Sequence, residues 1–343
     1  MSAAPGLLPL ATGAAGYGSD PSGLVCGFCF GADGQGRPVT AEEGLQVLAQ
    51  PGPGFVWLHF NLAHTASDKW LRERMALPEL FHEALREGSR STRVELNDDT
   101  LVAVVNDVHY DFAYEPSDIS TLWLSVGQRL VVSARLQPLR SIDRLRDAVK
   151  HGTRLPSSVA LLVHLMHDQG DVLVNIVRGT TTRVDDIEDK LLQGRVEKKR
   201  ADLGALRRLL VRLQRLLAPE PAALFRLLQK PPAWIVEDDL QDLRQSTEEF
   251  GVALRDMAAL QERIKLLQEE IAARVAEENN RSLFVLTIVT VLALPINIIA
   301  GLLGMNVGGV PLAQHPFGFW IVVGIVVTFT ALAAYFAFRN RRD

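Results

Sequence analysis

Two long runs of apolar residues without any charged side chain lie near the end of the chain. They are residues 283–303 (LFVLTIVTVLALPINIIAGLL) and 317–338 (FGFWIVVGIVVTFTALAAYFAF), of 21 and 22 residues. A helix needs about 20 apolar residues to cross a bilayer. One such run can also be a buried core helix, but two in succession predict two transmembrane helices, joined by an extracytoplasmic loop at 304–316.

A single long helix is expected to lead into the first run, because no proline occurs between Pro232 and Pro295. It would cover residues 236–303, about 100 Å at ~1.5 Å per residue. We therefore expect a stalk helix at 236–282 and the first transmembrane helix at 283–303. Apolar residues in the stalk recur every seven positions and predict a seam for partner helices: Leu243, Phe250, Met257, Ile264 and Ile271.

The pattern before the stalk predicts an α/β cytoplasmic domain at residues 21–155 and a helical hairpin at 156–230, the latter in two segments, about 157–193 and 198–229. Residues 55–60 are expected to form a strand, and two β-hairpins are expected to turn near 97–99 and 127–128. Helix starts are indicated by Thr40 with Glu43, a capping box, and by two prolines at first-turn positions, Pro78 and Pro138.

The first 20 residues are expected to form a flexible N-terminal tail without a signal peptide, since they lack a basic region. The two cysteines, Cys26 and Cys29, fit a reducing compartment. The loop at 304–316 contains no Lys or Arg, whereas arginines precede the first run and follow the second, in the basic tail 339–343. The positive-inside rule then places both termini in the cytoplasm.

The charge of the whole chain is −4, which is too small to suggest nucleic-acid binding. It is unevenly distributed, because residues 236–281 contain 12 Asp and Glu but 6 Lys and Arg. A solvated helix face is the ordinary reason for such a surplus. A surplus of this sign also concentrates cations near the entrance to the membrane.

The polar residues of the first apolar run are confined to one helical face. With small and apolar neighbours at three- and four-residue spacing, they fall within about 100° of arc. Asn297 is the most informative of them, because an amide at membrane depth needs water or a partner. An inter-helix hydrogen bond is the alternative. Two helices cannot enclose water, so a pore requires several copies. The predicted pore-lining residues are Asn280, Leu283, Thr287, Thr290, Leu294, Asn297 and Gly301.

Gly304, Met305 and Asn306 follow directly after the first run. This Gly-Met-Asn tripeptide, before a short loop and a second span, resembles the signature of the CorA family of metal-ion transporters, and the architecture of the whole chain is similar to that family. The loop sequence 307–311 (VGGVP) and residues 57–62 (WLHFNL) look like its zinc-transporter branch, ZntB. Magnesium-transporting relatives usually have an acidic residue where Leu312 stands here.

The resemblance implies a funnel-shaped homopentamer in the cell inner membrane, with the first transmembrane helix lining a central pore. Gly304, Met305 and Asn306 would form the selectivity entrance, where the amide of Asn306 meets a hydrated cation. The function implied is transport of divalent cations, most of all zinc, with proton coupling left open. A magnesium, cobalt or nickel channel is the alternative within the family, and a membrane-anchored coiled-coil scaffold is the alternative from another class.

Further metal ligands are sought among histidines and carboxylates, the usual zinc ligands besides thiolates. One helical face would carry His164, His167, Asp168 and Asp171, and His315 lies in the outer loop. A solvated helix surface is the ordinary interpretation of the first group, and an interfacial role that of His315. We expect no catalytic residues and no cofactor, because the chain has no nucleophile triad or nucleotide-binding motif.

Overall fold

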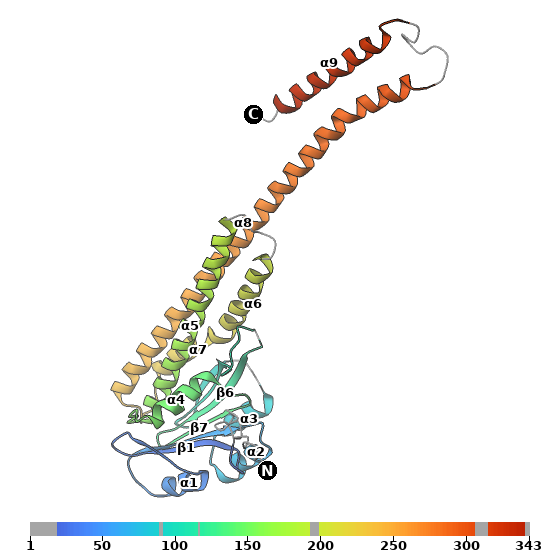
Figure 1. Cartoon of the computed structure of the whole chain (residues 1–343). Helices are drawn as coiled ribbons and strands as arrows, with labels where there is room; N and C mark the ends of the chain where they lie inside the picture. The colour runs from blue at the N-terminus through green and yellow to red at the C-terminus, as the bar shows by residue number, and fades with distance from the viewer. Residues whose placement is uncertain (1–18, 89–91, 116, 193–198, 306–314, 340–343) are drawn as a thin grey trace, which may run out of the picture. The chain divides into compact units, whose positions relative to one another are not determined.

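A computed structural model describes residues 19–88, 92–115, 117–192, 199–305 and 315–339 of the 343-residue chain. It comprises two compact units, Met1–Leu266 and Leu267–Asp343, which share one long helix. The first unit contains an α/β fold with a helical layer, and the second contains apolar helices (Figure 1).

The first unit is built on a seven-stranded sheet in the order β2-β1-β3-β7-β6-β5-β4. Among the described strands, β3 and β7 pair in parallel, and every other neighbouring pair is antiparallel. The strands are β1 (Leu24–Phe30), β2 (Gly36–Pro38), β3 (Phe55–Asn61), β4 (Arg93–Asn97), β5 (Thr100–Val108), β6 (Ile119–Val126) and β7 (Leu130–Arg135).

Both β-hairpins expected from the sequence are present, as β4–β5 and β6–β7. The turn between β4 and β5 places Asp98 and Asp99 at φ angles of 43° and 60°. Aspartate tolerates this left-handed region because its short polar side chain can hydrogen-bond locally. The strand expected at 55–60 is β3, whose residues from Phe55 to Phe60 are all buried.

Helices cover both faces of the sheet, so the core lies in two layers. One face packs against α1 (Ala41–Ala49), α2 (Thr65–Arg74) and α3 (Glu79–Glu87), and the other against α4 (Arg140–Lys150), α5 (Ser158–Leu192) and α7 (Pro219–Gln229). Cys26 packs against the second layer and Cys29 against the first, as residues three apart on a strand must. Both thiols are free.

Helix starts follow local chemistry. The capping box at the start of α1 is confirmed, because the Thr40 hydroxyl accepts from the Glu43 amide while the Glu43 carboxylate accepts from the Thr40 amide. The prolines stand just outside their helices rather than in the first turns: Pro78 is the N-cap of α3, and Pro138 precedes Leu139, the N-cap of α4. At these positions the fixed φ angle of proline restricts the backbone just before the helix begins.

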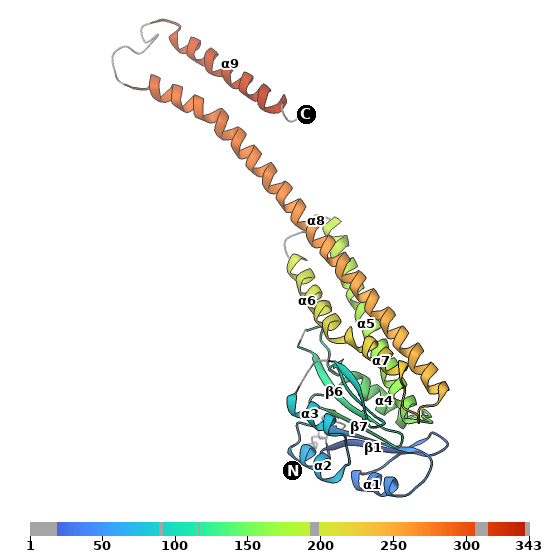
Figure 2. The same cartoon turned by 180° about the vertical axis from the view of Figure 1, so that it is seen from behind.

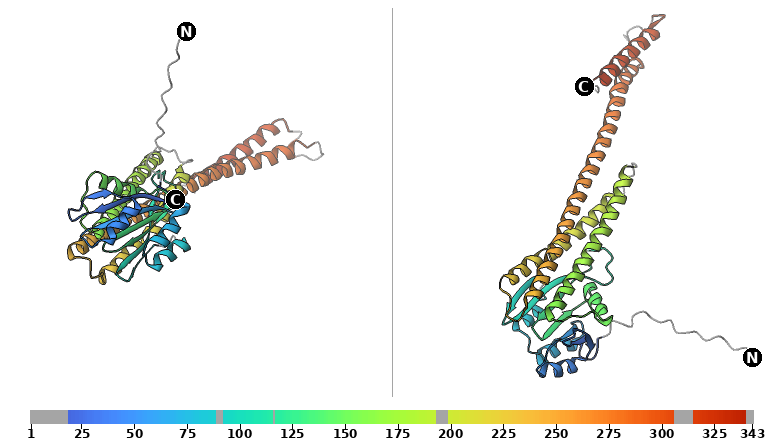
Figure 3. Two further views of the ribbon diagram at one scale, coloured as in Figure 1. Left: turned by 90° about the horizontal axis from the view of Figure 1, so that it is seen from below. Right: turned by 90° about the vertical axis from the view of Figure 1, so that its left-hand side faces the viewer.

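The described part of residues 156–230 forms three helices, α5, α6 and α7, where the sequence predicted two. The segment expected at 198–229 divides into α6 (Lys199–Leu217) and α7 (Pro219–Gln229). The physical reason is Pro219, which has no backbone N–H and therefore begins a new helix at its first position. In Figures 1 and 3 the C-terminal half of α5 extends away from the sheet.

Helix α8 (Glu237–Leu303) is continuous over 67 residues and includes Pro295. In the first unit its seven-residue seam is buried, with Leu243, Phe250, Met257 and Ile264 each at most 1% exposed. The apolar part of α8 is long enough to cross a membrane, and none of it is buried within the chain. The second apolar helix, α9 (Gly318–Arg339), is apolar over its described segment Gly318–Leu332.

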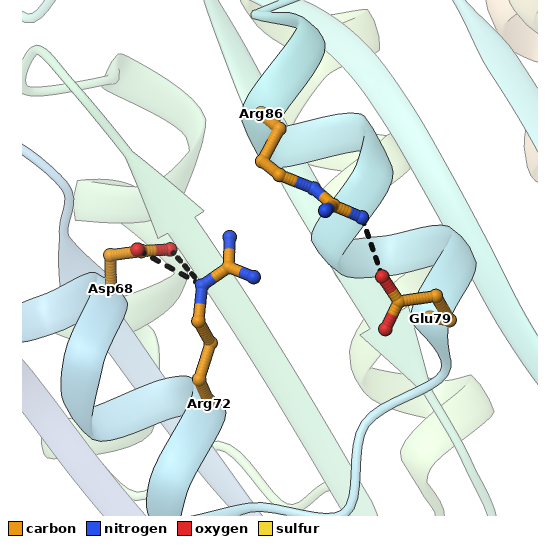
Figure 4. Close-up of polar contacts among 4 residues, drawn as sticks. All are labelled: Asp68, Arg72, Glu79 and Arg86. Atoms are coloured by element: carbon orange, nitrogen blue, oxygen red, sulfur yellow. Dashed lines mark hydrogen bonds and ion pairs between the residues drawn. The ribbon is translucent and has the colours of Figure 1, made fainter.

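Helices α2 and α3 carry a small group of surface ion pairs (Figure 4). Arg72 donates to Asp68 one turn earlier at 3.0 Å, and Arg86 reaches Glu79 two turns earlier at 2.5 Å. On the same helix as Arg86, His82 is buried, and this desolvation lowers its pKa. Exposed pairs of this kind contribute about 0–1 kcal/mol each to stability. We therefore interpret them as ordinary surface ion pairs and not as a functional site.

Among the described residues, three buried carboxyl groups of the first unit have pKa values raised by burial. Asp107 on β5 accepts from the backbone amide of Ser141 at 3.0 Å and so caps α4, although burial raises its pKa to about 6. Asp168 on α5 also has a pKa raised to about 6 by burial. Glu220 in the first turn of α7 is 1% exposed, and burial, with a smaller effect of Asp107, raises its pKa to about 8.

Removing a buried seam side chain is expected to destabilise the helical layer. Phe250→Ala should lower the free energy of unfolding by about 3–5 kcal/mol, because it leaves a cavity in a close-packed site. The matched change Leu266→Ala, at a position 57% exposed on the same helix, should cost less than about 0.5 kcal/mol. Thermal unfolding followed by tryptophan fluorescence compares the two. Equal losses would contradict the buried seam.

Glu220 is expected to make stability fall with rising pH. The folded chain keeps its proton up to a pKa of about 8, whereas the unfolded chain releases it near the ordinary glutamate pKa of 4.5. Stability is therefore highest below this window and declines as pH rises through it. Glu220→Gln should remove a decline on the order of a few kcal/mol. Melting temperatures at pH 5.5 and 8.5 measure it, and an equal gain at both would contradict the assignment.

Candidate ion pathway

The predicted polar stripe lies on the C-terminal part of α8, from the end of the stalk through the first apolar run, and every member is exposed in the single chain. Its seven positions, from Asn280 to Gly301, cover about 30 Å along the helix at ~1.5 Å per residue, the thickness of a bilayer core. The side-chain amide of Asn297 forms no hydrogen bond within the described residues. A group of this kind needs a partner outside the single chain.

The two threonines of the stripe use their hydroxyl protons within the helix. Thr287 donates to the Leu283 carbonyl and Thr290 to the Leu286 carbonyl, both at 2.8 Å. Each hydroxyl oxygen therefore presents only lone pairs outward. Lone pairs bind cations or the protons of their hydration water, so this arrangement suits a positively charged species.

Pro295 supplies one further acceptor near the stripe. Because proline has no N–H, the carbonyl of Val291 lacks its usual intrahelical donor, although α8 continues through this point. At 100° per residue Val291 lies next to the edge of the stripe. Backbone carbonyls of this kind are used in membrane proteins where they line a polar path.

The face of α8 opposite the polar stripe packs toward α9. Ile299 and Leu303 are half-buried and line a cavity of about 660 Å³ together with Val322, Val326 and other α9 residues. At 100° per residue this face lies about 150° from the centre of the stripe. Helix α9 therefore leaves the stripe uncovered.

The predicted entrance is only partly described. Gly304 ends α8, with its amide bonded to the Ala300 carbonyl at 2.9 Å, and Met305 is 49% exposed. Asn306 lies outside the described residues. His315 precedes α9, and its Nδ1 accepts from the Phe317 amide at 3.2 Å. The neutral ring then carries its proton on Nε2, so neither nitrogen offers a lone pair to zinc in this arrangement.

The structure does not assemble the cytoplasmic metal site predicted at His164, His167, Asp168 and Asp171. No group of three or more His, Cys, Asp or Glu side chains that could hold a metal is found in the described residues. The four share a helix face, but two of them have partners on neighbouring helices: Asp171 meets Arg144 at 3.7 Å, and His167 meets Glu249 at 3.6 Å. Only His164 and Asp168 remain together, at 3.7 Å.

Comparison with known proteins decides the family. Residues 52–339 match the family described as CorA-like Mg2+ transporter protein. The chain belongs to the CorA-like family. This is a family of transporters, and the match covers most of the sheet, the helical layer and both apolar helices.

Individual relatives agree over nearly the full length. The chain is 30% identical to the divalent cation transporter CmaX of Pseudomonas aeruginosa over 315 residues, 90% of this chain and 95% of that protein. It is 25% identical to the zinc transport protein ZntB of Yersinia pseudotuberculosis over 316 residues, 92% and 95% of the two chains. The solved structure of full-length CmaX superimposes with a TM-score of 0.80 at 29% identity, covering 95% of this chain and 99% of the other.

The structure also displays a basic surface that the sequence patterns above do not predict. Helix α6 gathers arginines on one exposed face, at the residues 207–215 (RRLLVRLQR). The signal is present in the sequence as arginines at helical spacing in a stretch without Asp or Glu. It is easily missed because the charge of the whole chain, and that of the stalk, is acidic.

If the stripe faces water, cysteines placed on it will react with a water-soluble thiol reagent. In a background with Cys26 and Cys29 changed to serine, we expect Thr290→Cys and Asn297→Cys to be labelled in membranes at least about tenfold faster than Leu292→Cys and Ile299→Cys, because a thiolate forms only where water solvates the charge. The latter pair is half-buried in the single chain. Equal labelling of all four positions would contradict a one-sided water path.

Proposed function

We propose that the chain is one subunit of a homopentamer that transports divalent cations, zinc foremost, across the cell inner membrane. Both termini would lie in the cytoplasm, and the first transmembrane helix would line the central pore. The observation that carries this proposal is the uncovered stripe of Asn and Thr side chains on α8, about 30 Å long. Membership of a transporter family supports it.

Several copies are needed because one chain offers only one lining face. The stripe and the α9 face of α8 point in nearly opposite directions, so symmetric copies can place all stripes on an axis and all α9 helices toward lipid. Each ring of side chains would then repeat the same oxygen donor at one depth. Hydroxyl and amide oxygens can hold the hydration water of a dication without removing it, which is costly for a small ion.

The entrance would be formed by Gly304, Met305 and Asn306, and the exit by the acidic stalk. Asn306 is proposed to accept hydrogen bonds from water around the incoming ion, as its place in the Gly-Met-Asn motif implies. The stalk carries twice as many acidic as basic residues between 236 and 281, which attracts cations on the cytoplasmic side. The membrane potential favours uptake by about 2.3 kcal/mol per charge per 100 mV.

Zinc is favoured over magnesium by the loop. Leu312 stands where magnesium-transporting relatives usually have a carboxylate, and the ZntB similarity extends over most of the chain. The alternative is a magnesium, cobalt or nickel channel, which the family description favours. Neither apolar run contains a carboxylate, so any proton coupling would use the bound water or groups outside the membrane.

Flux measurements with pore variants test the proposal. We expect purified protein in liposomes to take up zinc, and Asn306→Ala or Asn297→Leu to reduce the initial rate at least about tenfold, because each removes a ring of oxygen donors. The matched control Asn175→Ala, exposed on α5, should keep the wild-type rate. Unchanged zinc flux in both pore variants would contradict the proposal that α8 lines a pore.

The choice between ions is made in the same liposomes. Zinc flux that persists in excess magnesium and responds to an imposed proton gradient would establish a coupled zinc transporter. Flux that magnesium blocks and a proton gradient leaves unchanged would assign the chain to the magnesium-type channels.

A further inference from the structure

Helix α6 has an exposed basic face that contains one apolar residue at its centre. Val211 is 46% exposed and is surrounded by Arg207, Arg208, Arg212 and Arg215, which with it line a shallow depression of about 510 Å³. Most leucines of the same helix are buried. We call these four arginines with Val211 the arginine face.

Most of the charge on the arginine face is not neutralised by the part of the chain that the structure describes. Arg208, Arg212 and Arg215 form no ion pair with any described residue. No Asp or Glu occurs between Leu203 and Pro219, and like charges one turn apart destabilise a helix. The Nε of Arg212 is buried without a hydrogen-bond partner.

A surface of the opposite charge lies on α8, and it also has an exposed valine surrounded by charged residues. Val252 is likewise 46% exposed. The residues one turn before and after it are Glu248, Glu249, Arg255 and Asp256, all exposed, with a net charge of −2 from three carboxylates and one arginine. We call these four residues with Val252 the acidic face. Glu248 and Asp256 have no ion-pair partner within the described residues.

The two faces cannot meet within one chain. Helix α6 and the first part of α8 occupy different flanks of the helical layer of the first unit (Figures 1 and 2). Each chain therefore offers a basic flank and an acidic flank. Two different complementary surfaces on one chain make a head-to-tail contact, and such contacts generate rings when the rotation closes.

We propose that the arginine face of one copy docks on the acidic face of the next copy, with Val211 against Val252 at the centre. This proposal rests on the homo-oligomer of the proposed function and names a surface that would hold its cytoplasmic units together. An apolar centre inside a charged rim is the usual anatomy of a protein interface. Arginine forks bind carboxylates through two parallel hydrogen bonds, which fixes the register of the two helices. Charged rims act mainly on specificity and association rate.

Disulfide cross-linking of the full-length protein tests the contact. In a background with Cys26 and Cys29 changed to serine, Val211→Cys combined with Val252→Cys should form a ladder of covalent oligomers under mild oxidation. Either cysteine alone should not. The matched control pairs Val211→Cys with Val236→Cys, a valine 59% exposed at the start of the stalk, and should give only background.

Charge reversal and rescue separate this contact from simple proximity. Arg208→Glu with Arg212→Glu should reduce the rate of cross-linking at least about tenfold, because the rim charges then repel. Adding Glu248→Arg and Asp256→Arg should restore it, because the pairs are re-formed with opposite sign. Arg74→Glu, an exposed arginine on α2, should leave the rate unchanged. Thermal unfolding of each variant verifies that it is folded.

The outcomes distinguish the proposal from the proposed function. A pentameric mass and normal zinc flux without a Val211–Val252 cross-link would overturn the docking while leaving transport intact. Cross-linking that reversal does not slow would also overturn it, as would a loss on reversal that the second pair of changes fails to restore. A monomeric mass with no flux would instead remove the oligomer on which both depend.

Discussion

Helix α8 is one continuous helix with a part suited to water and a part suited to lipid, and the rest of the structure depends on this constraint. In water the helix is stabilised by burying a narrow apolar seam against the α/β unit, since an isolated helix gains little from its own hydrogen bonds. In lipid the helix forms its backbone hydrogen bonds internally. Its few polar side chains are then the groups that need hydrogen-bond partners. The same helix therefore buries apolar side chains in its N-terminal part and exposes amides and hydroxyls in its C-terminal part.

This reversal explains why the two ends place such different demands on their neighbours. The seam of the first unit is completed within the chain, where Phe250 and Met257 are buried from water. The stripe has no such partner among the described residues, because α9 lies on the far side of the helix. In the apolar part of α8 the polar stripe therefore needs water or a partner from outside the chain.

Sequence patterns identified those features that depend on spacing along one element. The apolar runs, the seam, the stripe and the Thr40 capping box all concern residues within a few turns of each other, where helix geometry is fixed. Patterns failed where a competitor on another element decided the outcome. His167 and Asp171 share a helix face, yet His167 lies 3.6 Å from Glu249 and Asp171 lies 3.7 Å from Arg144, and neither of these partners is close in sequence. The division at Pro219 was readable from one residue and shows that proline outweighs a continuous apolar pattern.

The missing backbone hydrogen bond at Pro295 has a mechanical consequence. A helix resists bending because every rung of its hydrogen-bond ladder must stretch on the convex side, and here one rung, at the Val291 carbonyl, is absent. The segment from Pro295 to Gly304 can therefore tilt as a short lever about a compliant joint, while the longer segment before it stays stiff. Such a tilt displaces the helix least beside Asn297, two residues past the joint, and most at its Gly304 end.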